Sequence, residues 1–288
     1  MTLLILGAGG QVGRELLERA GARGVGLDRA ACDITDPAAV THAVSQPMLS
    51  AVINCAAYTA VDRAESDREK AYAVNADGAG IVAAAAAARG LPVIHLSTDY
   101  VYAGTCAGPQ REDEPISPLN VYGASKAAGD RAVAVSNPRH LLLRVSWVFG
   151  VYGSNFVKTM LRLGRERDEL RIVDDQRGGP TEARDIADAL LAMAVACRRP
   201  GFAGWGTYHF AGRPCTSWHG FAQAVFERTA SQPPRLLPIS SRDYPTPAAR
   251  PSNSTLDCRR IRDVFGVDKP DWRASLSRVL RELGETTR

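Results

Sequence analysis

Short apolar runs alternate along the first half of the chain with longer stretches in which apolar residues recur every three or four positions. The apolar runs predict strands, at residues 3–6, 25–27, 51–55, 92–97 and 140–145. The periodic stretches predict helices, at residues 11–22, 37–45, 69–89 and 118–136. Such alternation is typical of an α/β fold in which helices cover both faces of a parallel, doubly wound sheet.

After residue 150 this alternation becomes looser. The pattern predicts a helix over 155–166, a strand over 170–173 and a helix over 184–196, followed by Pro233-Pro234 and a proline-containing loop at 244–247. We interpret residues 1–150 as one domain, to which residues 174–200 return. Residues 151–288 then form a smaller α/β C-terminal lobe, which we expect to close over the first domain.

The first predicted strand ends in a glycine-rich turn that carries Gly7, Gly10 and Gly13 and leads directly into a helix. A tight turn also favours glycine without any ligand, but the strand, turn and helix together match a Rossmann-type dinucleotide fingerprint. Glycine lets the backbone approach a pyrophosphate, and the helix N-terminus favours its negative charge. We therefore expect the first domain to bind a dinucleotide.

The second predicted strand ends at Asp28, about 20 residues beyond the turn, where a carboxylate accepts hydrogen bonds from an adenosine ribose. Arg29 follows directly and would suit a 2′-phosphate instead. Because the two side chains favour different cofactors, NADH and NADPH both remain open.

Composition excludes several other classes of protein. Hydrophobic residues make up 45% and charged residues 23% of the chain, and the formal net charge is +4 without a long block of one sign. These values are ordinary for a folded protein and do not indicate a nucleic-acid partner. No signal peptide or membrane-spanning run is evident, and the six cysteines show no CxxC pair, so we expect a cytoplasmic protein without a zinc site or disulfides.

Tyr122, Lys126 and Thr98 form a candidate catalytic set. Reduction of a carbonyl by a nicotinamide requires a proton for the developing alkoxide, and the Tyr122 phenol can supply it. Lys126 lies four residues further on the same helix face, where its ammonium can favour the ionised phenol and reach the cofactor ribose. Thr98 ends the fourth predicted strand and can place its hydroxyl on the same carbonyl oxygen. Each residue alone also fits a purely structural role; their combination with the glycine turn favours catalysis.

Several longer motifs resemble the extended short-chain dehydrogenase/reductases, and within them the dTDP-4-dehydrorhamnose reductase family. The resemblance covers nearly the whole chain. The segments that carry it are GAGGQVG at 7–13, NCAAYTAVDRAE at 54–65, STDYVY at 97–102, NVYGASK at 120–126, RVSWVF at 144–149, NFVKTMLRL at 155–163, DDQRGGPT at 174–181 and YPTPAARPSNS at 244–254.

This resemblance implies reduction of the C4 ketone of a dTDP-linked deoxysugar, giving dTDP-L-rhamnose, with Thr98, Tyr122 and Lys126 as the catalytic residues. It also implies two sets of binding residues. Those for the cofactor are Gly7, Gly10, Gln11, Val12, Gly13, Asp28, Arg29, Asp33, Ile34, Ala56, Ala57 and Tyr58, with Tyr122 and Lys126. Those for the sugar nucleotide are Val61, Thr98, Asp99, Tyr100, Trp147, Asn155 and Arg250. Trp147 also fits a core position, and Arg250 a surface charge.

Three alternatives accompany this interpretation. The sequence does not exclude another 4-keto nucleotide-sugar reductase. Sugar-nucleotide 4,6-dehydratases resemble this fold but place an Asp-Glu pair after the strand-end threonine, whereas here Tyr100 follows Asp99. The regulatory subunit of methionine adenosyltransferase resembles these reductases and acts by binding alone, but the retained Thr98, Tyr122 and Lys126 speak against that role.

The oligomeric state stays open between a monomer and a homodimer. Some relatives pair through acidic residues that hold a divalent metal. Glu15 suits such a site, but Arg184 falls near the place of another carboxylate, so we expect no metal.

Overall fold

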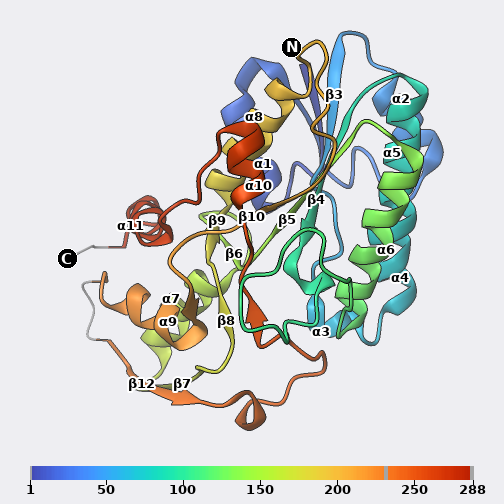
Figure 1. Cartoon of the computed structure of the whole chain (residues 1–288). Coiled ribbons are helices and arrows are strands. Elements are labelled where there is room, and N and C mark those ends of the chain that lie inside the picture. The colour runs from blue at the N-terminus through green and yellow to red at the C-terminus, as the bar shows by residue number, and fades with distance from the viewer. Residues whose placement is uncertain (1, 230–232, 286–288) are drawn as a thin grey trace.

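The computed structural model describes residues 2–229 and 233–285, and its centre is a six-stranded parallel sheet (Figure 1). The strand order is β10-β5-β4-β3-β1-β2. These strands are β1 (Thr2–Leu6), β2 (Gly24–Leu27), β3 (Leu49–Asn54), β4 (Val93–Thr98), β5 (His140–Val145) and β10 (Gly206–Phe210). The first five lie where the apolar runs predicted them, and β10 was not predicted.

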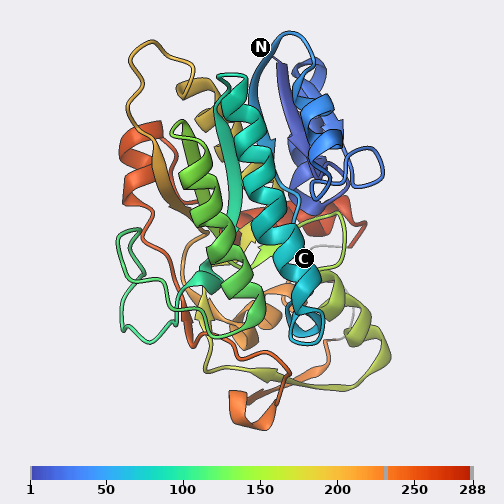
Figure 2. The ribbon, with the colours of Figure 1, turned by 90° about the vertical axis from the view of Figure 1, so that its right-hand side faces the viewer.

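Helices cover both faces of the sheet, which confirms the predicted doubly wound α/β fold (Figures 1 and 2). One face carries α1 (Gln11–Ala20) and α8 (Ala183–Ala196), which pack against each other, together with α10 (Arg259–Phe265). The other face carries α2 (Pro37–Val44), α5 (Ala79–Ala88) and α6 (Val121–Ser136). The order of strands reverses between β1 and β3, and in such sheets ligands bind at the carboxyl ends of the strands beside this point.

Helix α6 begins later than the predicted residue 118 because Asn120 caps it. The Asn120 side chain accepts a hydrogen bond of 2.7 Å from the backbone N–H of Gly123, and its own backbone is extended. This cap fixes the first turn of α6, on which Tyr122 lies.

The predicted helix over 69–89 is observed as one continuous helical stretch, Arg68–Ala88. It consists of α4 (Arg68–Tyr72), a π-helical segment (Ala73–Gly78) and α5. By length and apolar composition alone, this stretch is able to cross a membrane. Its buried side chains, among them Val82 and Ala86, pack in the core beside the sheet, as in the core helices of folded domains.

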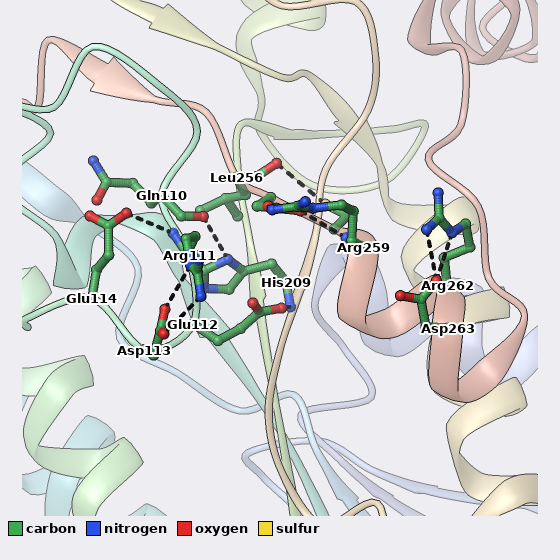
Figure 3. A network of polar contacts seen from close by, with 12 residues as sticks. Gln110, Arg111, Glu112, Asp113, Glu114, His209, Leu256, Arg259, Arg262 and Asp263 are labelled. Atoms are coloured by element: carbon green, nitrogen blue, oxygen red, sulfur yellow. Dashed lines mark hydrogen bonds and ion pairs between the residues drawn. The ribbon is translucent and has the colours of Figure 1, made fainter.

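The edge strand β10 is held by the long loop between β4 and α6. The imidazole Nδ1 of His209 lies 3.2 Å from the carbonyl oxygen of Gln110, and the backbone N–H of His209 donates to the Glu112 carboxylate at 3.2 Å (Figure 3). These contacts satisfy polar groups along the open edge of the sheet.

A second lobe has its own apolar core, which includes Phe149, Phe221 and Trp272. The helices around this core are α7 (Phe156–Glu166), α9 (Trp218–Phe226) and α11 (Trp272–Glu282), and β7 (Glu169–Val173) pairs with β12 (Arg235–Ile239). The sequence predicted α7 and β7 but not α9, α10, α11 or β12. The remaining short elements are α3 (Val61–Ala64), β6 (Val148–Phe149), β8 (Arg177–Gly178), β9 (Thr181–Glu182), β11 (Thr216–Ser217), β13 (Asn253–Ser254) and 3-10 turns at Gly21–Arg23, Asp99–Val101 and Ser241–Asp243.

Candidate active site

The three glycines of the first turn differ in whether the fold itself requires glycine at their position. Gly7 has a φ of 77°, and a Cβ there would lie 2.5 Å from the backbone nitrogen of Ala56. A Cβ on Gly13 would lie 2.2 Å from the carbonyl oxygen of Gly7. The turn itself therefore requires glycine at these two positions.

Gly10 is not required by packing. The nearest atom to a Cβ at this position is the carbonyl oxygen of Gly7, at 3.4 Å, and the residue is exposed at the N-terminus of α1. No side chain caps this helix, so no capping side chain satisfies the amides of its first turn, at Gln11, Val12 and Gly13. An anion fits this place because the positive end of the helix dipole is also there.

A cavity of about 360 Å³ lies beside this turn. Most of the residues predicted to bind the cofactor line it: Gly7, Gly10, Asp28, Arg29, Asp33, Ile34, Ala56, Ala57 and Tyr58. Val12 and Gly13 are buried, so only their backbone can face a ligand. Gln11 donates from its amide to the carbonyl oxygen of Ser154 at 3.3 Å, which joins the first turn of α1 to the second lobe.

Both groups that bear on cofactor choice are exposed beside this cavity. One carboxylate oxygen of Asp28 accepts hydrogen bonds of 3.0 Å from the backbone N–H groups of Ala30 and Ala31. Arg29 forms an ion pair of 3.4 Å with Asp33. An acid and a cation thus lie side by side, and the geometry suits either ribose form.

The catalytic candidates come from the end of β4 and the start of α6. Thr98 donates to the Asp99 carboxylate at 3.0 Å and accepts from the backbone N–H of Tyr100 at 3.2 Å. Burial raises the pKa of Tyr122 to about 12, and a hydrogen bond with Thr98 opposes part of this rise. The phenol is therefore protonated at neutral pH and available as a proton donor.

Lys126 is fully buried beneath this site. Its Nζ donates to the carbonyl oxygen of Leu96 at 2.8 Å and lies 3.1 Å from Nε2 of His95. Burial lowers the pKa of Lys126 to about 8, while Asp130 acts in the opposite direction. The amine of Lys126 therefore contacts β4 in this structure. Sequence reasoning missed His95, although an ionisable residue within the apolar run of β4 was a usable signal.

Asp99, predicted to contact the sugar, is buried between Thr98 and Ser146. The Ser146 hydroxyl donates to its carboxylate at 3.3 Å. Burial raises the pKa of Asp99 from the ordinary value of 3.8 to about 6, although hydrogen bonds from Ser254, Thr98 and Ser146 lower it in part. Asp99 therefore supports the Thr98 hydroxyl from behind.

This burial predicts a pH-dependent effect of Asp99→Asn on stability. Because the folded state binds the Asp99 proton more tightly than the unfolded state, the wild-type protein loses stability as the pH rises from about 4 to about 6. The loss amounts to about 2–3 kcal/mol. The free energy of unfolding of Asp99→Asn, measured relative to wild type, should therefore be higher at pH 8 than at pH 4 by about that amount. Denaturant unfolding at both pH values measures this, and an equal difference at both would contradict it.

A second cavity, of about 930 Å³, lies between the two lobes. Tyr100 and Arg250, both predicted to face the sugar nucleotide, line this cleft, as does Asp62. Arg250 forms two hydrogen bonds with the Asp62 carboxylate, of 2.6 and 2.7 Å, which position its guanidinium fork. Val61 precedes Asp62 and begins the short helix α3.

Trp147 and Asn155 do not line this cleft but support it. The indole of Trp147 stacks on that of Trp218, with ring centroids 3.6 Å apart, and Trp218 does line the cleft. Asn155 caps α7 and donates to the carbonyl oxygen of Gly150 at 2.7 Å and to Gln11 at 3.1 Å. Sequence reasoning missed Trp218 and also Gln176, which accepts from the Trp218 indole N–H at 3.1 Å.

The acidic position considered for a shared metal lies on α1. Burial raises the pKa of Glu15, as do Glu18 and Glu282, while Arg184 lowers it. Arg184 also forms an ion pair of 2.9 Å with Glu282. Within residues 2–229 and 233–285, no group of three or more His, Cys, Asp or Glu side chains is arranged to hold a metal ion.

The parallel sheet, its glycine turn and the paired phenol and amine beside it define a protein of the Rossmann-type, nucleotide-binding α/β class. Comparison with known proteins gives the family. The family model described as "RmlD substrate binding domain" matches residues 1–285, and the chain belongs to this family.

Individual relatives agree over almost their whole length. A dTDP-4-dehydrorhamnose reductase from Aggregatibacter actinomycetemcomitans is 43% identical, with 96% of this chain and 97% of the relative covered. The enzyme of that name from Escherichia coli is 40% identical over 100% of this chain and 99% of its own length. A solved dTDP-4-dehydrorhamnose reductase from Bacillus anthracis, in complex with NADP, is 35% identical, with a TM-score of 0.91 over 98% of this chain and 100% of that one.

Proposed function

We propose that this chain reduces the C4 ketone of dTDP-4-dehydro-L-rhamnose to dTDP-L-rhamnose, using NADPH or NADH. The observation that carries the proposal is the Tyr122 phenol, which shares a hydrogen bond with Thr98 at the carboxyl end of β4. The ring of Tyr122 lies 5.6 Å from that of Tyr100, which lines the cleft between the lobes. The relatives that share the full length of the chain support the same reaction.

The cavity beside the glycine turn fits a dinucleotide. Gly10 and the free amides of α1 would hold the pyrophosphate, and Asp28 or Arg29 the adenosine ribose. When bound, the reduced nicotinamide supplies the hydride that reaches the carbonyl carbon.

The chain's own residues manage the proton and the sugar. Tyr122 transfers its phenolic proton to the carbonyl oxygen as that oxygen gains charge. Once its hydroxyl turns from Asp99, Thr98 donates a hydrogen bond to the same oxygen. The positive charge of Lys126 favours the phenolate that remains. Asp62 engages both terminal nitrogens of Arg250, so the guanidinium would reach the diphosphate of the substrate through its remaining N–H groups.

The two cavities assign cofactor binding and substrate binding to different parts of the chain. Residues 1–150 with 174–200 bind the cofactor, and the rest of the chain from residue 151 binds the sugar nucleotide. None of the six cysteines, all within the described residues, forms a disulfide, which favours a reducing, cytoplasmic location. The protein acts as a monomer or a homodimer.

An activity screen tests the proposal. The protein is incubated with NADPH or NADH and a panel of 4-keto nucleotide sugars that differ in base and in sugar. Oxidation of the cofactor is followed by the loss of absorbance of the reduced nicotinamide. We expect turnover with dTDP-4-dehydro-L-rhamnose. Turnover only with another 4-keto sugar would correct the substrate, and binding without any turnover would indicate a non-catalytic, regulatory role.

A further inference from the structure

A buried chain of polar groups connects Lys126 to the end of β3. Nζ of Lys126 lies 3.1 Å from Nε2 of His95, and Nδ1 of His95 lies 3.2 Å from the amide nitrogen of Asn54. All three side chains are at most 1% exposed. In such surroundings each proton needs a donor and an acceptor, so the contacts determine where the protons lie.

The orientation of the Asn54 amide is fixed from the other side. The backbone N–H of Ala56 donates to Oδ1 of Asn54 at 3.0 Å. Nδ2 of Asn54 therefore faces His95, and because an amide nitrogen only donates, Nδ1 of His95 must accept. If the amide were flipped, its Nδ2 would face the Ala56 N–H, and two donors would then oppose each other.

This arrangement determines the tautomer of His95. Burial and the nearby Lys126 hold the pKa of His95 well below its usual range, so the ring is neutral. A neutral ring that accepts at Nδ1 carries its proton on Nε2, which faces Lys126. An ammonium has three donors and no lone pair, whereas a neutral amine accepts this proton and still donates to the carbonyl oxygen of Leu96.

We propose that His95, oriented by Asn54, is a positioning residue that holds Lys126 as a neutral amine in the free protein at alkaline pH, so that binding of the reduced cofactor there draws one proton from solvent onto Lys126. The proposal rests on the proposed function, because Lys126 must turn from His95 toward the cofactor ribose. Once turned, its nitrogen would face the ribose oxygens of the cofactor, and these acceptors together with the negative charge of the cofactor would favour the ammonium.

The other ionisable groups around Lys126 are compatible with its protonation when the cofactor binds. From α6, Asp130 favours the ammonium, but one oxygen of its carboxylate, Oδ2, is engaged by Arg144 at 3.0 Å. Cys55 directly follows β3, and burial raises the pKa of its thiol to about 12, so the thiol is neutral. Cys55 also lines the cofactor cavity, which places Lys126 directly behind it.

Calorimetry of NADPH binding tests the proton uptake. Titrations in two buffers of different protonation enthalpy give the number of protons taken up per bound cofactor. Because the pKa of Lys126 in the free protein is about 8, we expect uptake to approach one proton at about pH 9 and to vanish near about pH 6.5. Binding at pH 9 without uptake would overturn the inference.

Nitrogen-15 NMR of the imidazole tests the tautomer independently of any cofactor. In the free protein at about pH 9, the His95 signals should show the proton on Nε2, and His95→Gln identifies those signals. A proton on Nδ1 would overturn the inference. If wild type binds no NADPH, the proposed function fails, while this spectrum still decides the state of His95.

Asn54→Asp provides a directed variant. A carboxylate keeps the acceptor for Ala56 but also accepts from His95, which moves the ring proton to Nδ1 and leaves Nε2 free to accept from an ammonium. Uptake at about pH 9 should then fall to less than half of the wild-type value. His140→Asn, on neighbouring β5 but outside this chain of contacts, is the matched control and should retain wild-type uptake. If Asn54→Asp does not fold, the two wild-type measurements still decide.

Discussion

Tyr122→Phe is expected to lower kcat by about three orders of magnitude while leaving cofactor affinity within about threefold of wild type. The substitution removes only the hydroxyl that gives its proton to the carbonyl oxygen, and general acids contribute typically 10²–10⁴-fold to such steps. The ring, its edge contact with Tyr100 and its place on α6 are retained. A loss in kcat without a loss in binding is what removal of a proton donor produces.

Steady-state kinetics and a fluorescence titration with NADPH measure the two quantities. Tyr208→Phe is the matched control, because Tyr208 is a buried phenol on β10 whose hydroxyl donates to the carbonyl oxygen of Gly204. It should lose some stability but keep kcat within about threefold of wild type, since its hydroxyl makes an ordinary hydrogen bond. Full activity of Tyr122→Phe would show that another group, or water, supplies the proton.

The part of the fold that could be predicted from sequence is the part that local pattern specifies. Strands β1, β3, β4 and β5 are mostly buried, so each reads as an apolar run between helical stretches, and the half-buried edge strand β2 is a shorter run of the same kind. Strand β10 has the sequence GTYHF, in which polar residues interrupt the apolar pattern. Its place in the sheet depends on pairing with β5 and on the loop that binds His209, contacts that join residues far apart in sequence. Helix α9 escaped prediction because its nine residues include a glycine and a histidine.

The candidate site divides in the same way. The glycine turn and the Tyr122–Lys126 spacing are local, so both were visible in the sequence. The partner of Arg250 was not, since Asp62 lies 188 positions away. Likewise, the stacking of Trp218 on Trp147 depends on packing in the core of the second lobe, between residues far apart in sequence, and it moves Trp147 from the predicted lining of the cleft to a place behind it. Sequence motifs thus identified chemical groups, while long-range packing determined which surface each one faces.

Substitution of alanine at Gly10 and at Gly13 should separate a glycine needed by the ligand from one needed by the fold. At Gly10 a methyl group meets nothing closer than 3.4 Å, so the free protein should unfold at the wild-type temperature. The same methyl group would occupy the approach to the amides of α1, so we expect the Kd of NADPH to rise by about 10–100-fold, an effect of about 1.4–2.8 kcal/mol.

Gly13→Ala should show the opposite pattern in thermal unfolding. Its methyl group would lie 2.2 Å from a backbone oxygen of Gly7, which cannot move without opening the turn. Overpacking of this kind destabilises by about 3 kcal/mol, and for a chain of this size the unfolding midpoint should fall by roughly 5 °C. Scanning calorimetry of both variants, with and without saturating NADPH, measures each effect. If Gly10→Ala binds NADPH as tightly as wild type, the pyrophosphate does not lie against this turn at Gly10.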